Sequence, residues 1–298
     1  MRPLEGVLVV DLTRYLPGPF ASRELLDLGA RVVRLEPPGG DPMHDLAPAW
    51  HEALNAGKES VTCDLKTEPE RGRSLCAEAD VVIESFRPGV VERLGVGPSD
   101  LPDTVVYCSI TGFGLGGRHE RRAGHDLNYQ GWAGLLADTA PAIPAAQLAD
   151  LAAGSLVAVT KILAALLERE KTGRGTHVVV SMTHGSHRFA AHRLRGEPLP
   201  KLLTGGLACY GIYGTADGRH LTVGALESKF FIRLCELLGL PELAALQFDP
   251  AAQVEIANAL GERFAQKPLA DWLELFDAED VSVGPVSTLS EAAEEFGS

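Results

Sequence analysis

The chain has 298 residues, of which 45% are hydrophobic and 22% are charged, and its formal net charge is −13 at pH 7. This is the composition of an ordinary globular protein, with enough apolar residues for a sizeable core. It argues against a nucleic-acid partner, because such proteins carry a basic stripe and this acidic chain has none.

The cysteines and the apolar segments indicate the compartment. The cysteines lie far apart, without a CxxC spacing, at Cys63, Cys76, Cys108, Cys209 and Cys235. Such a set is typical of reduced thiols in the cytoplasm, so neither a disulfide nor a metal site is expected. The N-terminus runs directly into a strand pattern, so we expect no signal peptide. The longest apolar stretch, Leu151–Leu167, is shorter than a bilayer span and predicts a buried helix, so no membrane partner is expected.

The first part of the chain alternates short apolar runs with helical patterns. Strands are predicted at residues 7–12, 31–36, 61–65, 81–84 and 105–110. Helices are predicted between them at residues 20–28 and 68–79. Strand–helix–strand units of this kind form parallel sheets through right-handed crossovers. The expected fold class is therefore α/β, with a Rossmann-like parallel sheet in a large domain.

The remaining residues predict the end of this domain and a second, smaller one. A helix is expected from Asp150 to about Glu170, followed by a strand at 177–180. Residues 194–204, which include Pro198 and Pro200, are interpreted as a linker between a large domain, 1–193, and a small domain, 205–290. The small domain is expected to be α+β, with a hairpin around residues 215–218 and helices at about 228–238, 251–266 and 268–278.

Two motifs carry the chemistry. Gly124–Tyr129 places the imidazole of His125 directly after a glycine, and Ala149–Gly154 places the carboxyl of Asp150 at the start of an apolar helix. A base and an acid of matched strength are what proton transfer at an activated carbon requires. Asp150 must be partly desolvated to act as an acid near neutral pH, and the apolar residues after it favour that. We also expect Asp150 to cap its helix and to lie in the first turn, where free backbone N–H groups can bind an oxyanion.

These motifs occur with others along nearly the whole chain. The others are Pro3–Val7, Leu28–Glu36, Asn55–Thr62, Glu84–Gly89, Ser109–Gly114 and Ala216–Arg219. In their order and spacing the motifs resemble the class III CoA-transferase family of CaiB/BaiF type, and in particular its α-methylacyl-CoA racemase-like branch. The resemblance implies an acyl-CoA substrate, with coenzyme A as part of that substrate and no tightly bound cofactor.

The resemblance leaves two activities open. In the racemases, the residues matching His125 and Asp150 act as acid and base on opposite faces of the α-carbon, and a glutamate matching Glu227 hydrogen-bonds the histidine. In the transferases, the aspartate matching Asp150 attacks the thioester and carries CoA as an aspartyl thioester. Gly124–Tyr129 is similar to the racemase form, so we expect epimerisation of a 2-methylacyl-CoA. CoA transfer is the alternative, and a non-catalytic CoA-binding relative is a third.

The family's coenzyme-contacting stretches match several positions of this chain. These are Arg34, Asn55, Gly57, Lys58, Arg87, Gly124, Asp126 and Tyr129. Arg87 comes directly after a predicted strand, where α/β folds bind ligands. An arginine that often follows the position of Glu36 is replaced by Pro37, which motivates the non-catalytic alternative.

Some of these residues have simpler interpretations. Glu227 can cap the helix that begins near Ser228. Asp126 can either form a turn or support the residues that contact the ligand. His184, His187 and His192 have no metal-ligand spacing and are expected on a solvated helix face.

The resemblance also implies a homodimer, in which the large domain of one chain and the small domain of the other build the site. Relatives continue beyond the position of Ser298 and interlock, so whether this dimer interlocks is left open.

Overall fold

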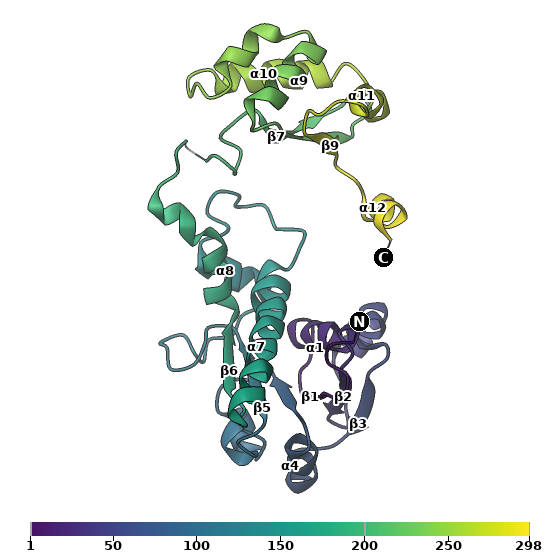
Figure 1. Ribbon diagram of the computed structural model, residues 1–298, viewed down its shortest axis with the longest axis vertical. Helices are drawn as coiled ribbons and strands as arrows, with labels where there is room; N and C mark the ends of the chain where they lie inside the picture. The colour runs from purple at the N-terminus through teal and green to yellow at the C-terminus, as the bar shows by residue number, and fades with distance from the viewer. Residues whose placement is uncertain (1, 200, 298) are drawn as a thin grey trace. The chain divides into compact units, whose positions relative to one another are not determined.

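The computed structural model describes residues 2–199 and 201–297. The chain divides into two compact units, Met1–His192 and Arg193–Ser298 (Figure 1). The predicted large domain ends at residue 193, and the predicted linker at 194–204 falls in the second unit. Pro200 of that linker, like the terminal residues Met1 and Ser298, lies outside the described residues.

The first unit is built on a sheet that has six strands in its described part. The strands are β1 (Leu8–Asp11), β2 (Arg31–Glu36), β3 (Glu59–Thr62), β4 (Val81–Glu84), β5 (Val106–Thr111) and β6 (His177–Ser181). All neighbours are parallel, in the order β3-β2-β1-β4-β5-β6, which is the order of a Rossmann fold. The predicted α/β class and Rossmann-like sheet are confirmed.

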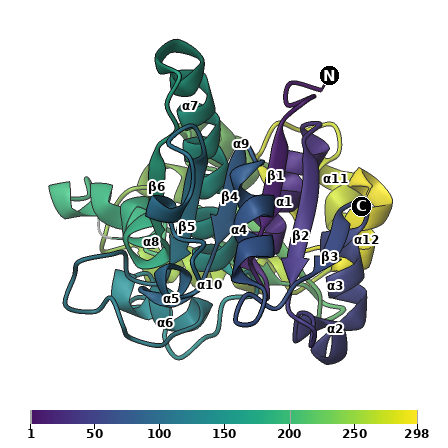
Figure 2. The same cartoon turned by 90° about the horizontal axis from the view of Figure 1, so that it is seen from below.

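Helices lie between these strands and after the last of them (Figure 2). They are α1 (Pro17–Asp27), α2 (Met43–Leu46), α3 (Pro48–Asn55), α4 (Pro69–Ala77), α5 (Val90–Arg93), η1 (Pro98–Asp100), α6 (Asp126–Ala133), η2 (Ala149–Leu156), α7 (Val157–Thr172), α8 (Met182–Ala190) and η3 (Ala191–Arg195). The sequence patterns predict α1 and α4, but not the short helices α3 and α6. The expected solvated helix face corresponds to α8, on which His184 and His187 are exposed. Helices α6 and α8 pack against each other and against η2, and this three-way contact builds the site described below.

Strand side chains alternate between two apolar cores. Val9 and Ile83 pack into one core, whereas their neighbours Val10 and Val82 pack into the other. Successive side chains of a strand point to opposite faces, so a strand that is buried on both faces is apolar at consecutive positions. This explains why β1 and β4 are continuous apolar runs in the sequence.

The helical stretch Ala149–Thr172, formed by η2 and α7, is long and apolar enough to cross a membrane by length and composition alone. Its inner face, which includes Ala158, Ile162 and Ala165, is buried in the core beside β5 and β6. A core helix and a membrane span share this composition. The apolar stretch is thus a helix with one buried face, as its sequence predicts.

The second unit contains an antiparallel sheet with helices. Its described elements are β7 (Tyr210–Gly214), β8 (His220–Gly224), α9 (Ser228–Leu238), η4 (Pro241–Leu246), α10 (Gln253–Phe264), α11 (Leu269–Phe276), β9 (Val283–Pro285) and α12 (Leu289–Phe296). A separate core surrounds Phe231, Phe264 and Trp272. The predicted hairpin and the three predicted helices are present, whereas β9 and α12 are not predicted.

Candidate active site

Two loops that line the candidate site follow the neighbouring strands β1 and β4. Strands β1 and β4 are paired at the middle of the sheet. On the β1 side the next strands are β2 and β3, and on the β4 side they are β5 and β6, so the direction of winding reverses between β1 and β4 and the site lies at this switch point. A cavity of about 580 Å³ opens there. Its lining includes Arg14, Tyr15, Pro17, Ser85, Phe86, Arg87, Glu120, Arg122, Gly124, His125, Asn128, Tyr129, Asp150 and Met182. We call it the Asp150 cavity.

Helix α6 holds His125 at the rim of this cavity. His125 is the N-cap residue of α6, and its backbone N–H donates a hydrogen bond of 3.0 Å to Oδ1 of Asn128. The hydroxyl of Tyr129 donates to the carbonyl oxygen of Gly124, which closes the turn before the histidine. The imidazole of His125 is exposed and forms no hydrogen bond with any described residue, so it is free to meet a substrate.

Glycine is required beside the Tyr129 ring. A Cβ on Gly124 would lie 2.7 Å from Cε1 of Tyr129, and a Cβ on Gly112 would lie 2.5 Å from the same atom. Real Cβ contacts are not this short, because the atoms would overlap. The ring therefore packs closely against both glycines, and this fixes the turn that carries His125.

Asp150 lies in the first turn of η2, which is a π-helical segment of eight residues. The hydroxyl of Ser155 donates to the carbonyl oxygens of Asp150 and Pro17, at 2.9 and 2.6 Å. It thereby joins the widened helix to the first residue of α1. Short π-helical segments are rare and are concentrated at functional sites. Here the segment turns the carboxyl of Asp150 toward the cavity.

Asp126 ties the two motifs together. Its Oδ1 accepts hydrogen bonds from the backbone N–H groups of Ala149 and Asp150, at 2.8 and 3.0 Å, and its Oδ2 accepts one from Nε2 of Gln130 at 2.6 Å. Two expectations are therefore wrong. The first-turn N–H groups of Ala149 and Asp150 are not free for an oxyanion, because they donate to Asp126. Asp150 also does not cap the helix: Leu148 occupies the N-cap position, and the side chain that accepts from the first-turn N–H groups is that of Asp126. A side chain that caps a helix from a distant motif leaves no pattern in the local sequence.

The environment of Asp150 matches the chemistry expected of it. Burial, reinforced by the nearby carboxylate of Asp126, raises the pKa of Asp150 to about 7. The carboxyl forms no hydrogen bond with any described residue, so no such bond stabilises its charged form. Near neutral pH the group is thus available both as an acid and as a base. Burial and the same carboxyl raise the pKa of Tyr129 to about 12, so its phenol stays protonated.

Of the eleven predicted site residues, the structure brings five together in one cavity and places a sixth, Asp126, against the backbone of Asp150. His125, Asp150, Arg87, Gly124 and Tyr129 all line the Asp150 cavity. Their roles toward a coenzyme stay predictions.

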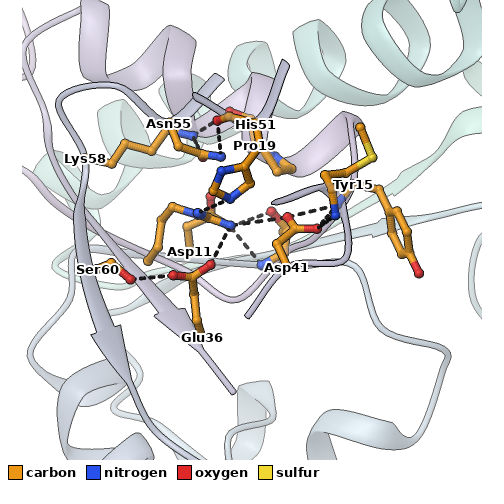
Figure 3. Close-up of polar contacts among 12 residues, drawn as sticks. Asp11, Tyr15, Pro19, Glu36, Asp41, His51, Asn55, Lys58 and Ser60 are labelled. Carbon is orange, nitrogen blue, oxygen red and sulfur yellow. Dashed lines mark hydrogen bonds and ion pairs between the residues drawn. The ribbon is translucent and has the colours of Figure 1, made fainter. Parts of the chain in front are cut away.

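Asn55 and Lys58 lie instead in a hydrogen-bonded network with His51 (Figure 3), and Arg34 joins this network through the His51 ring. Arg34 is 3% exposed and contacts Glu36, Asp41 and His51. The ammonium of Lys58 donates to Pro19, Ser22 and Asn55, and burial lowers its pKa to about 8.

Gly57, next to Lys58, has a φ of +82°, which suits the turn it occupies. As coenzyme contacts these four residues stay predictions, and Arg34 and Lys58 have protein partners in this structure.

A second cavity, of about 660 Å³, adjoins the first. It contains the basic residues Arg14, Lys66 and Arg93, and Arg14 and Phe86 line both cavities. The guanidinium of Arg14 lies 5.9 Å from the centre of the Phe86 ring. Pro37 lines this second cavity, so the family arginine that it replaces would have added another cation here. Sequence reasoning placed Arg87 by the rule that ligands bind after parallel strands, and the same rule, applied to the first strand, would have found Arg14 and Tyr15.

Glu227 belongs to the second unit, where it is the N-cap residue of α9 and exposed. Glu227 thus occupies the capping position, but its side chain forms no capping hydrogen bond. A contact with His125 stays a prediction. Within residues 2–199 and 201–297, no three His, Cys, Asp or Glu side chains are grouped so as to hold a metal ion.

Comparison with known proteins gives consistent matches. The model of the family "CoA-transferase family III" matches residues 4–296. The chain is 35% identical to human alpha-methylacyl-CoA racemase, over 97% of this chain and 78% of the relative. It is 33% identical to mouse succinyl-CoA:glutarate CoA-transferase, over 99% and 74%. Among solved structures, a CAIB/BAIF family protein from Brucella suis superposes with a TM-score of 0.84 at 32% identity, over 98% of this chain and 86% of that one.

Proposed function

The chain belongs to CoA-transferase family III, and on that basis we propose that it epimerises the α-carbon of a 2-methylacyl-CoA. The observation that carries the proposal is that His125 and Asp150 line one cavity, in which burial raises the pKa of Asp150 to about 7. An α-proton next to a thioester is a far weaker acid than either side chain. Its removal needs a base held in contact, and inversion needs an acid on the far face.

In the proposed reaction, His125 takes the α-proton and the electron pair of the C–H bond passes into the thioester as an enolate. Protonated Asp150 then gives its proton to the opposite face of the same carbon. In the reverse direction the two residues exchange roles. A carboxyl with a pKa near 7 suits both directions, because neither its protonated nor its ionised form is rare at neutral pH.

The coenzyme is proposed to span both cavities. Its reacting thioester would lie beside Asp150, and its phosphates would meet the cations of the second cavity, Arg14, Lys66 and Arg93. Arg14 and Phe86 line both cavities and are placed to follow the chain of the ligand from one to the other. Cations on a basic cavity wall recognise phosphate through charge-assisted hydrogen bonds.

CoA transfer is the second candidate. The ionised carboxyl of Asp150 is free of hydrogen bonds to described residues, as a nucleophile requires, and relatives with 32–33% identity are CoA-transferases. This reaction would pass through a covalent thioester between CoA and Asp150, and it would not need the imidazole of His125.

The decisive experiment is incubation of a (2R)-2-methylacyl-CoA with the enzyme in D2O. We expect deuterium at the α-carbon together with formation of the 2S epimer. The variant His125→Gln should lower this rate by about 10²- to 10⁴-fold, the usual contribution of one acid–base group. His44→Gln, which changes an exposed histidine outside both cavities, is the matched control and should retain the wild-type rate.

Two outcomes would contradict epimerisation. Absence of α-deuteration at saturating substrate would exclude it. Trapping of Asp150 by hydroxylamine in the presence of an acyl-CoA and an acceptor acid, with activity retained in His125→Gln, would establish transfer. Binding of CoA with neither reaction would support a non-catalytic relative.

We also propose that the enzyme is a cytoplasmic homodimer. Its cysteines are all unpaired and buried, which suits a reducing compartment. Light scattering of the purified protein would test the dimer.

A further inference from the structure

Tyr15 has an unusual backbone at the wall of the Asp150 cavity. Its φ is +67°, in the left-handed region that side chains other than glycine rarely adopt. Such strain persists only where the surrounding structure holds it, and it is concentrated at functional sites. The side chain is 47% exposed and lines the same cavity as Asp150.

Asp41 holds this backbone. Both carboxylate oxygens of Asp41 accept from the backbone N–H of Tyr15, at 3.3 and 3.2 Å, and Oδ1 also accepts from the N–H of Met43 at 3.0 Å. Asp41 is 3% exposed, and its charge is balanced by Arg34, whose Nη2 lies 3.2 Å from Oδ2. A buried carboxylate and the buried guanidinium that balances its charge thus hold one turn of the loop after β1.

The phenol of Tyr15 is not part of this network. Figure 3 shows the ring directed away from Asp41 and the groups around it. No described residue hydrogen-bonds its hydroxyl. A cavity wall therefore carries a donor and an aromatic face that the protein itself does not use, held by a backbone that is costly to maintain.

The position of Tyr15 along the loop indicates which part of a ligand it meets. Arg14, one residue before it, lines both cavities. Pro17, two residues after it, is bonded through Ser155 to the helix turn that carries Asp150. Tyr15 lines the Asp150 cavity and not the second one, where the phosphates are proposed to bind, so it faces the part of the ligand that enters the Asp150 cavity.

We propose that Tyr15 binds the pantetheine–thioester part of the acyl-CoA through its phenol, and that Asp41 and Arg34 are positioning residues that hold it there. The inference rests on the proposed acyl-CoA substrate. It also gives Arg34 a role different from the coenzyme contact that the family motifs imply.

Calorimetric binding tests the phenol. The probes are isobutyryl-CoA, which has the whole ligand, and adenosine 3′,5′-bisphosphate, which lacks the pantetheine arm. Tyr15→Phe should raise the Kd for isobutyryl-CoA by about threefold to tenfold, the worth of one hydrogen bond, and Tyr15→Ala should raise it further. The Kd for the bisphosphate should not change. Tyr107→Phe is the control, since its buried hydroxyl bonds Val96 away from both cavities, and it should leave both Kd values unchanged.

Asp41 is tested through Tyr15. Asp41→Asn should weaken isobutyryl-CoA binding in the wild-type background but add nothing in the Tyr15→Ala background, because it acts only through the phenol. A general structural defect would lower affinity equally in both.

The strained backbone is checked separately. Tyr15→Gly should melt above Tyr15→Ala, because both lack the ring and only glycine accepts a positive φ freely. If Asp41→Asn does not fold, the melting temperatures of Tyr15→Gly and Tyr15→Ala still show whether the backbone at residue 15 is strained.

The outcomes separate this inference from the function on which it rests. If the wild type does not bind isobutyryl-CoA, the proposed function fails, and the inference fails with it. If the wild type binds and Tyr15→Phe and Tyr15→Ala bind equally well, the role of Tyr15 alone is overturned. Equal melting temperatures for Tyr15→Gly and Tyr15→Ala would overturn the strained backbone, and additive effects of Asp41→Asn would overturn the positioning role.

Discussion

The carboxyl of Asp150 is kept out of water and next to a second carboxylate, and both effects penalise its charge. Its pKa is therefore raised to about 7 from an ordinary value near 3.8. A group whose pKa is higher in the folded state stabilises the fold fully below its unfolded pKa. That contribution is lost as the pH rises through its folded pKa. For Asp150 the loss falls between about pH 4 and pH 7.

The first residue-scale prediction concerns stability. Asp150→Asn removes the buried charge, so it should raise the melting temperature at pH 8.5 while leaving it nearly unchanged at pH 4. The gain should be about 2–4 °C for each kcal/mol of relieved charge burial. Calorimetry at both pH values measures it. A loss of stability at pH 8.5 would mean that the ionised carboxylate is stabilised in the fold.

The pH dependence of activity separates the two candidate reactions. A two-base reaction needs one proton shared between His125 and Asp150, so kcat/KM should be bell-shaped with pH. A nucleophilic Asp150 needs only to be ionised, so the rate of CoA transfer should fall below about pH 7 without an alkaline limb of its own. Initial rates between pH 5 and pH 9 with each substrate pair distinguish these shapes.

At the scale of single elements, α6 depends on glycine where the Tyr129 ring packs. Gly124→Ala would bring a Cβ within 2.7 Å of that ring, so the turn that carries His125 must shift. We expect kcat to fall by about 10²-fold, since a misplacement of roughly 1 Å has that effect. Gly117→Ala is the control, because a Cβ there meets nothing within 4 Å. Equal rates for the two variants would show that the turn tolerates the shift.

The sequence predicts the elements whose own residues determine them. Strands β1 and β4 are buried on both sides, and their apolar runs mark them almost residue by residue. Helix α9 is bounded by Glu227 and Gly239, and its predicted bounds are those observed. In these cases local composition and tertiary burial favour the same structure.

Other elements are set by contacts that the local sequence does not contain. The pattern of α8 is interrupted by Gly185, which is needed because a Cβ there would lie 2.9 Å from Ala153 of η2. Ser155 of the π-helical η2 hydrogen-bonds Pro17, 138 positions away. The pair His125 and Asp150 could be predicted from motifs, whereas the bonds from Asp126 and the strained Tyr15 depend on tertiary structure.

At the scale of the whole molecule, each unit has its own core. Phe231 is fully buried in the second one, while its neighbour Ile232 is 43% exposed. Phe231→Ala should destabilise that unit by about 3–5 kcal/mol, and Ile232→Ala, the matched control, by far less. Trp272 lies in the same core and reports its unfolding by fluorescence once Trp50 and Trp132 are replaced by Phe. A cost of less than 1 kcal/mol for Phe231→Ala would contradict a separate core.

The bonds from Asp126 to Ala149 and Asp150 have a consequence for how such a chain can diversify. They join α6 directly to η2, so the 134–147 segment between them is not needed to hold His125 and Asp150 in register. That segment is largely exposed and contains no helix or strand among its described residues. Lengthening a surface loop costs little entropy. Insertions and deletions in this segment are therefore expected to leave the placement of His125 and Asp150 unchanged.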